Sequence, residues 1–174
     1  MSCFVFKAHV LSYIERSTPA IFHCSPSILC LLDNVQLYFL DAVETSLKDA
    51  LLHFNLAPLS SKRHISMLGL IHKSQLGIAP TCLSSCFPRA RSTLYNFSDS
   101  LSPIHDRQVA CHVTPSCPII FRRSVFALVR VYNKLPADVV SATSVSLFQR
   151  RLTALLKASA RSDAPKWDEL FNIK

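Results

Sequence analysis

Apolar residues recur every three or four positions in several stretches of this chain, which is the pattern of helices that bury one face. Residues 4–16 form the first stretch. The second starts at Ser25-Pro26, because a serine caps a helix well and a proline fits the first turn. Its inward face is expected to consist of Ile28, Leu31, Leu32, Val35, Tyr38 and Phe39.

Two further helices are expected before residue 78. Ser46 and Asp49 have the spacing of a capping box, and Pro58 ends the helix that they start. The next helix is capped by Ser60 or Ser61 and closed by a glycine, Gly77, where a left-handed residue is usually needed. On this helix Ile65, Leu68 and Ile71 are expected inward, and Lys62, Arg63 and Lys73 in solvent.

The second half of the chain begins with a segment without periodicity. Residues 86–119 are rich in Pro, Ser and Cys and are expected to form a long loop. The sequence RRSVFALVRVYNKL then predicts a helix that Pro136 ends, and Thr143 or Ser144 caps another. The apolar stripe of that last helix is Val145, Phe148, Leu152, Leu155 and Leu156, and a short terminal helix contains Trp167, Leu170 and Phe171.

Composition agrees with a helical protein. The chain has 174 residues with 49% apolar side chains, enough to form a core, and its two glycines are too few for the tight turns of a β-sandwich or barrel. We therefore expect a mainly α protein, a small irregular helical bundle with a long Pro/Ser/Cys-rich loop. Its expected parts are an N-terminal helical part over 1–85, an irregular loop over 86–120 and a C-terminal helical part over 121–174.

Positive charge is concentrated in the middle and later parts of the chain. The net charge is +8, but residues 1–59 hold three basic and five acidic side chains, whereas residues 60–161 hold fourteen and three. Such a field suits a polyanion, because Lys and Arg displace counterions from phosphates. The alternative is a solvated surface. The candidate nucleic-acid contacts are Lys62, Arg63, Lys73, Arg122, Arg123, Arg130, Arg150 and Arg151.

Catalytic and metal chemistry finds little support in the motifs. No Asp-Asp or Asp-x-Asp pair occurs for a two-metal site, no glycine-rich loop is present, and no cofactor is expected. A hydrolase stays an alternative, because catalytic side chains such as Ser, His and Asp can meet in the fold without being close in the sequence. A structural zinc site would need pairs of closely spaced ligands. The preferred interpretation of the cysteines is that they are free thiols in the core or in loops. Zinc binding stays open for Cys82, Cys86, Cys111, His112 and Cys117.

The chain is expected to be intracellular, either nuclear or cytoplasmic, and not secreted. No uncharged stretch is long enough to span a membrane, and Lys7 interrupts the N-terminal apolar patch that a signal peptide would need. Seven cysteines, an odd number, favour free thiols in a reducing compartment. The oligomeric state stays open.

Several motifs together resemble the C-terminal region of jockey-type non-LTR retrotransposon reverse transcriptases. The resemblance covers roughly residues 13–155 and is carried by LLDNVQLYFL, LAPLSSKRHISMLGLIHK, GIAP and RRSVFALVRVYNKLPADVVSATSVSLFQRRL. Its most specific part is an aromatic-Asn-x-Leu-Pro elbow, followed by a Ser-x-x-x-Phe helix. The matching residues are Lys62, Arg63, His72, Arg123, Ser124, Tyr132, Asn133, Leu135, Pro136, Val139, Ser144, Phe148 and Leu152.

This resemblance implies a fragment without enzymatic activity of its own. The family polymerises DNA on RNA, but the catalytic palm with its paired aspartates has no counterpart here, and Tyr132 stands where tryptophan is usual. The implied role is to contact the phosphates of RNA or an RNA–DNA duplex. An alternative from another class is an independent basic helical adaptor that binds protein. Salt dependence separates the two, since only phosphate contacts weaken steeply with salt.

Overall fold

The computed structural model describes residues 3–90, 105–110 and 118–172, and these are mainly helical. Within them no strand forms, and a single antiparallel bridge pairs Arg89 with Val109. The predicted mainly α class is therefore confirmed. Residues 91–104 and 111–117 of the predicted loop lie outside the described part.

The chain forms two compact units, which are described one at a time. Unit 1 comprises residues 1–64 and 153–172, and unit 2 comprises residues 65–152 and 173–174. The boundaries lie inside two long helices, α6 (Leu59–Gln75) and α11 (Val145–Arg161). The expected division of the sequence into three consecutive parts stays a prediction.

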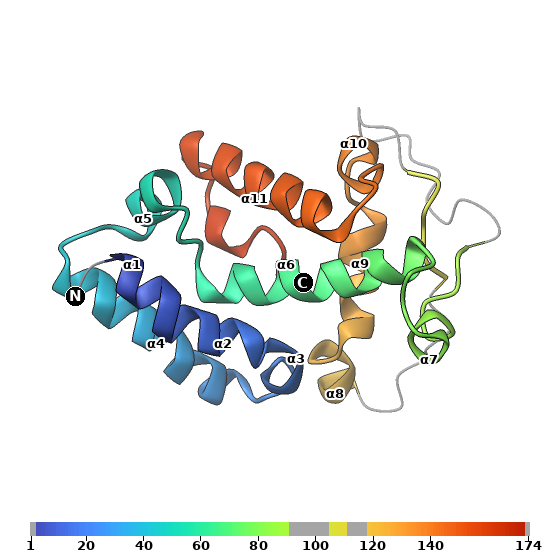
Figure 1. Ribbon diagram of the computed structural model, residues 1–174, viewed down its shortest axis with the longest axis horizontal. Coiled ribbons are helices and arrows are strands. Elements are labelled where there is room, and N and C mark those ends of the chain that lie inside the picture. Colours follow the sequence, from blue (N-terminus) through green and yellow to red (C-terminus); the bar gives the residue numbers. More distant parts are fainter. Residues whose placement is uncertain (1–2, 91–104, 111–117, 173–174) are drawn as a thin grey trace. The chain divides into compact units, whose positions relative to one another are not determined.

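Unit 1 is built on the N-terminal helices (Figure 1). The helical run Cys3–Arg16, with α1 (Cys3–Val5), η1 (Phe6–Leu11) and α2 (Ser12–Arg16), lies beside α4 (Pro26–Ala42), and Phe6 stacks on Phe39 with ring centroids 4.0 Å apart. Leu11, Ile14 and Leu40 extend the same core. The remaining elements of unit 1 are α3 (Thr18–Ile21), α5 (Leu47–Phe54), η3 (Trp167–Glu169) and the adjoining parts of α6 and α11.

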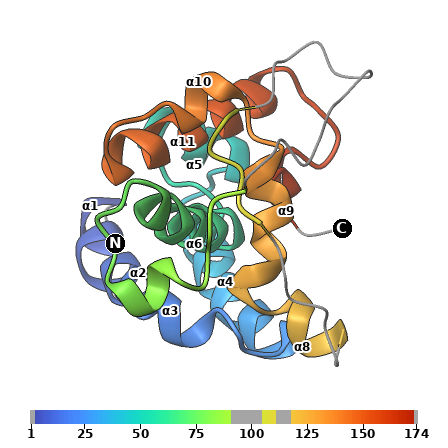
Figure 2. The same cartoon turned by 90° about the vertical axis from the view of Figure 1, so that its right-hand side faces the viewer.

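Unit 2 surrounds the C-terminal part of α6 (Figure 2). It contains α7 (Thr81–Ser84), α8 (Pro118–Arg122), η2 (Val125–Ala127), α9 (Leu128–Asn133), α10 (Ala137–Val140) and the start of α11. The predicted single helix over RRSVFALVRVYNKL is wrong, because Ser124 has an extended backbone and separates α8 from η2. The side chain of Ser124 donates to Phe121 O at 2.7 Å, which stabilises this break. The predicted loop also ends earlier than expected, since α8 already begins at Pro118.

Three predicted helix caps are confirmed. Ser25 Oγ and Ser144 Oγ each accept a hydrogen bond from the amide three residues further on. Ser46 Oγ accepts from the amide of Asp49 at 3.1 Å, which is the serine half of a capping box, and the Ser46 hydroxyl also donates to the Asp49 carboxylate at 2.6 Å. Gly77 is confirmed as the left-handed residue after α6, with a φ of 72°.

The predicted cap of α6 is wrong. This helix begins at Leu59, so that Ser60 and Ser61 lie inside its first turn. Its first amide is bound instead by Gln36 of α4, whose Oε1 accepts from Leu59 N at 2.9 Å while its Nε2 donates to Ala57 O at 3.0 Å. A buried glutamine from another helix therefore caps α6.

The predicted inward face of α4 is also largely wrong. Phe39 is buried as expected, but the other buried residues are Leu40 and Gln36. Four of the apolar residues expected in the core are instead open to solvent: Ile28 is 49% exposed, Leu31 67%, Val35 39% and Tyr38 73%.

Candidate nucleic-acid interface

The elbow of unit 2 is held by a buried network around Tyr132. His72 Nε2 lies 3.1 Å from the carbonyl oxygen of Ala142, so this nitrogen carries the proton and donates. His72 Nδ1, 3.0 Å from the Tyr132 hydroxyl, must then accept from it. The imidazole also stacks on Phe148 with ring centroids 4.1 Å apart. Burial lowers the pKa of His72 from 6.5 to about 4, so the ring is neutral at physiological pH.

A second histidine reaches the same tyrosine from segment 105–110. His105 Nε2 donates to Tyr132 O at 3.0 Å, and its Nδ1 is buried without a hydrogen-bond partner among the described residues. Burial lowers the pKa of His105 and raises the pKa of the Tyr132 phenol. Both histidines are buried, and their hydrogen bonds join α6 and the 105–110 segment to the elbow.

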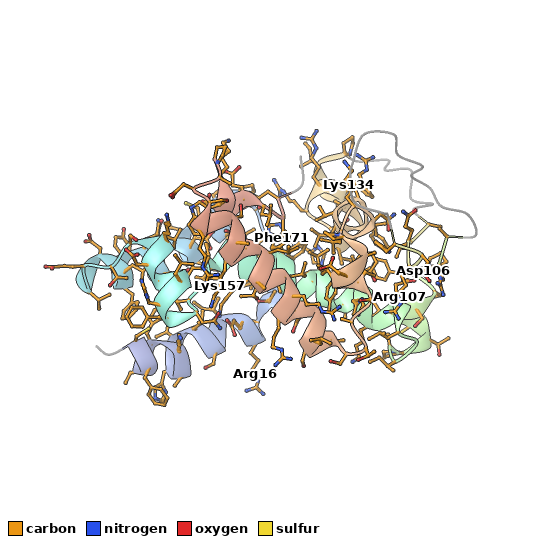
Figure 3. The ribbon with its side chains drawn as sticks, turned by 90° about the horizontal axis from the view of Figure 1, so that it is seen from above. Arg16, Asp106, Arg107, Lys134, Lys157 and Phe171 are labelled. Atoms are coloured by element: carbon orange, nitrogen blue, oxygen red, sulfur yellow. The ribbon has the colours of Figure 1, made fainter. Side chains whose placement is uncertain are left out.

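The asparagine of the elbow, Asn133, binds the backbone of the 105–110 segment. Its Oδ1 accepts from Val109 N and its Nδ2 donates to Val109 O, both at 2.9 Å, so one side chain satisfies both backbone groups of a buried residue. Arg107 completes the attachment, since its guanidinium donates to Val140 O at 2.8 Å and to Ala142 O at 3.1 Å. Asp106 and Arg107 lie next to one another in this segment (Figure 3).

Replacing Asn133 with leucine is expected to lower the free energy of unfolding by about 2–4 kcal/mol, because two buried backbone groups of Val109 lose their partners. Urea unfolding followed by circular dichroism measures this change. Replacement of the exposed neighbour Lys134 with leucine is the control and should change stability by less than about 0.5 kcal/mol. Equal effects of the two variants would refute the proposed role of Asn133.

Two of the predicted nucleic-acid contacts do not lie in solvent. Arg63 is only 4% exposed and forms a bidentate ion pair with Asp33 of α4, with N–O distances of 2.6 and 2.9 Å. Lys62 is half-buried and pairs with Glu15. The prediction that both stay in solvent is wrong, because each is bound to a carboxylate of unit 1 that the sequence places far away.

Arg151 is likewise engaged within the fold. Its guanidinium donates to the carbonyl oxygen of Asp138 and, at 2.9 Å, to the hydroxyl of Ser141. Arg123 is half-buried and has interactions of its own within the chain. Arg151 therefore attaches α11 to α10 and the residue that follows it.

The remaining predicted contacts are exposed, and the structure adds one more. Arg130 and Lys134 lie one turn apart at α9, whereas Leu128, Val129 and Tyr132 of the same helix are buried. Sequence reasoning missed Lys134, although its spacing of four residues from Arg130 predicts a common face. Figure 3 labels its side chain at the end of α9. We call the exposed predicted contacts together with Lys134 the exposed basic set: Lys73, Arg122, Arg130, Lys134 and Arg150.

The exposed basic set is not neutralised by nearby acids. None of its members forms an ion pair with the residues that the structure describes. Residues 65–152 contain ten Lys and Arg side chains but only three Asp and Glu side chains. Of these acids, Asp106 already pairs with Arg89 at 2.9 Å. Unit 2 therefore presents uncompensated positive charge to solvent.

Of the five candidate zinc ligands, the structure describes Cys82 and Cys86. No group of three His, Cys, Asp or Glu side chains able to hold an ion occurs among residues 3–90, 105–110 and 118–172. Cys82 and Cys86 are exposed on and after α7, while Cys111, His112 and Cys117 lie outside the described part.

In the described part of the chain, no helix combines the length and the apolar character that a membrane span requires. Comparison with known proteins finds no match among protein families, curated proteins or solved structures.

Proposed function

We propose that this chain is the C-terminal region of a non-LTR retrotransposon reverse transcriptase, that it is not itself an enzyme, and that it binds the phosphates of RNA or an RNA–DNA duplex inside the cell. The observation that carries the binding role is the exposed basic set of unit 2, which no described carboxylate neutralises. Guanidinium and ammonium groups bind phosphates through charge and hydrogen bonds without reading bases.

The resemblance is supported by how its residues are used. His72, Phe148 and the adjacent pair Tyr132-Asn133 come from three separate stretches of the sequence, and all four are buried in unit 2, where His72 contacts Tyr132 and Phe148 and Asn133 binds Val109. The aromatic residue, the asparagine and the distant histidine of the motif therefore lie in the same unit, and the aromatic residue and the histidine contact one another. Sequencing the transcript upstream of the Met1 codon tests the assignment, since a reading frame for a palm with paired aspartates is expected there.

Charge removal tests the binding role. The triple variant Arg130→Ser, Lys134→Ser and Arg150→Ser is expected to bind an RNA–DNA duplex at least about tenfold more weakly at fixed salt, because several phosphate contacts are lost. Fluorescence anisotropy with a labelled duplex measures the affinity.

The control removes three exposed basic residues from unit 1, by the changes Arg16→Ser, Arg161→Ser and Lys166→Ser. It lowers the net charge by the same amount, and only a small loss is expected. If both triple variants lose affinity equally, binding follows total charge and the exposed basic set has no special role.

The adaptor function stays the second candidate because of the open apolar side chains on α4. A protein partner bound through apolar contacts would be insensitive to salt, whereas duplex binding weakens as salt rises.

A further inference from the structure

Helix α4 carries more apolar surface than unit 1 covers. Ile28, Leu31, Val35 and Tyr38, which we call the α4 stripe, follow one another at intervals of three, four and three residues. At about 100° per residue they fall within roughly a quarter of the helix circumference. This quarter borders the side on which Phe39 and Leu40 are buried. The apolar arc of α4 is therefore only partly occupied.

The spacing of the α4 stripe fits another helix. Alternating intervals of three and four residues place side chains along one nearly straight seam, where each can insert between residues of a facing helix. An extended strand would present side chains at intervals of two and would not match this seam.

The charges of unit 1 permit two copies to approach. Between residues 26 and 40 the only charged side chain is Asp33, which is already bound to Arg63. Unit 1 as a whole contains eight Lys and Arg side chains and eight Asp and Glu side chains. The net charge of unit 1 is zero, although that of the whole chain is +8, so contact between two copies through unit 1 brings no surfaces of like net charge together.

We propose that the α4 stripe binds the α4 stripe of a second copy of this chain, with the two helices antiparallel about a two-fold axis. In this arrangement Leu31 of one copy faces Val35 of the other, and Ile28 faces Tyr38. The same patch is used on both copies, which is the rule for a closed symmetric dimer. The antiparallel orientation also places opposite helix dipoles side by side. This inference goes beyond phosphate binding and does not depend on it.

Sedimentation velocity over a concentration series tests the dimer. The wild-type chain is expected to show a reversible monomer–dimer equilibrium that persists at high salt. Leu31→Glu should raise the dimer dissociation constant at least about tenfold, because a charge enters the apolar seam of both copies. Leu31 is exposed, so circular dichroism should show unchanged helix content in this variant.

Leu37→Glu is the matched control, with the same substitution on the same helix. Leu37 is 48% exposed but lies about a third of a turn away from Leu31. It should change the dissociation constant by less than about twofold. A wild-type chain that stays monomeric at every concentration overturns the proposal. So do equal effects of the two substitutions, oligomers that do not stop at the dimer, or a monomer that pairs with the helix of a different protein through the stripe.

Discussion

Lowering the pH from 7 to 5 is expected to reduce the free energy of unfolding by about 2 kcal/mol for each of His64 and His72. Burial lowers the pKa of each from 6.5 to about 4. The unfolded chain therefore takes up protons first as the pH falls. Their stability contribution is complete above pH 6.5 and is lost progressively toward pH 4. His105, whose pKa burial also lowers, acts in the same direction.

Urea unfolding at a series of pH values measures this loss. His64 belongs to unit 1, where its Nδ1 lies 2.8 Å from Ser60 O and its ring contacts Phe22, so it can be replaced without opening the Tyr132 network of unit 2. His64→Gln should reduce the pH dependence by roughly the share of one histidine. A free energy of unfolding that stays constant from pH 7 to pH 5 would contradict the buried, neutral state of these rings.

Replacement of Asp33 with leucine is expected to cost about 3 kcal/mol of unfolding free energy. The substitution leaves the Arg63 guanidinium, whose side chain is 5% exposed, without its only ion-pair partner among the described residues. Breaking a buried ion pair from one side typically costs 3–5 kcal/mol, and the partial exposure of Asp33 favours the lower end. Urea unfolding with circular dichroism provides the measurement.

Glu15→Leu is the control for this prediction, because the Lys62–Glu15 pair is more open to solvent. Its loss should cost no more than about 1 kcal/mol. The double variant Asp33→Leu and Arg63→Met should recover most of the stability lost by Asp33→Leu, since no buried charge is then left unpaired. Similar costs for Asp33→Leu and Glu15→Leu would show that Arg63 is not a buried ion-pair partner.

The sequence predicted the start of a helix correctly where the capping side chain and the amide that it binds are close together in the chain. Ser25, Ser46 and Ser144 cap helices because each side chain reaches an amide only three residues away. The start of α6 could not be predicted this way. Its first amide is bound by Gln36, which lies 23 residues earlier and meets it only in the folded unit.

The local sequence also could not predict which side of α4 is buried. The apolar residues of this helix form a broad arc, and periodicity does not say which part of the arc other helices will cover. A polar residue, Gln36, occupies the covered side because its two hydrogen bonds are needed there. Ile28 and Tyr38, apolar and correctly spaced, remain outside.

The candidate site could be predicted only in part. Sequence reasoning treated the pairs Lys62-Arg63 and Arg150-Arg151 as solvent-facing charge, because their partners are not neighbours in the chain. Asp33 and Glu15 lie 30 and 47 residues from the side chains that they bind. Arg130 and Arg150 are exposed as charge patterning suggests, and spacing alone would have added Lys134.

The most direct test of phosphate binding by this chain is the salt dependence of its affinity for an RNA–DNA duplex. We predict that the logarithm of the association constant falls linearly with the logarithm of salt concentration. The slope should be roughly −3 to −4.5, because the exposed basic set supplies up to five phosphate contacts and each contributes about −0.9. Absence of binding at low salt, or an affinity that does not change with salt, would contradict the proposed function.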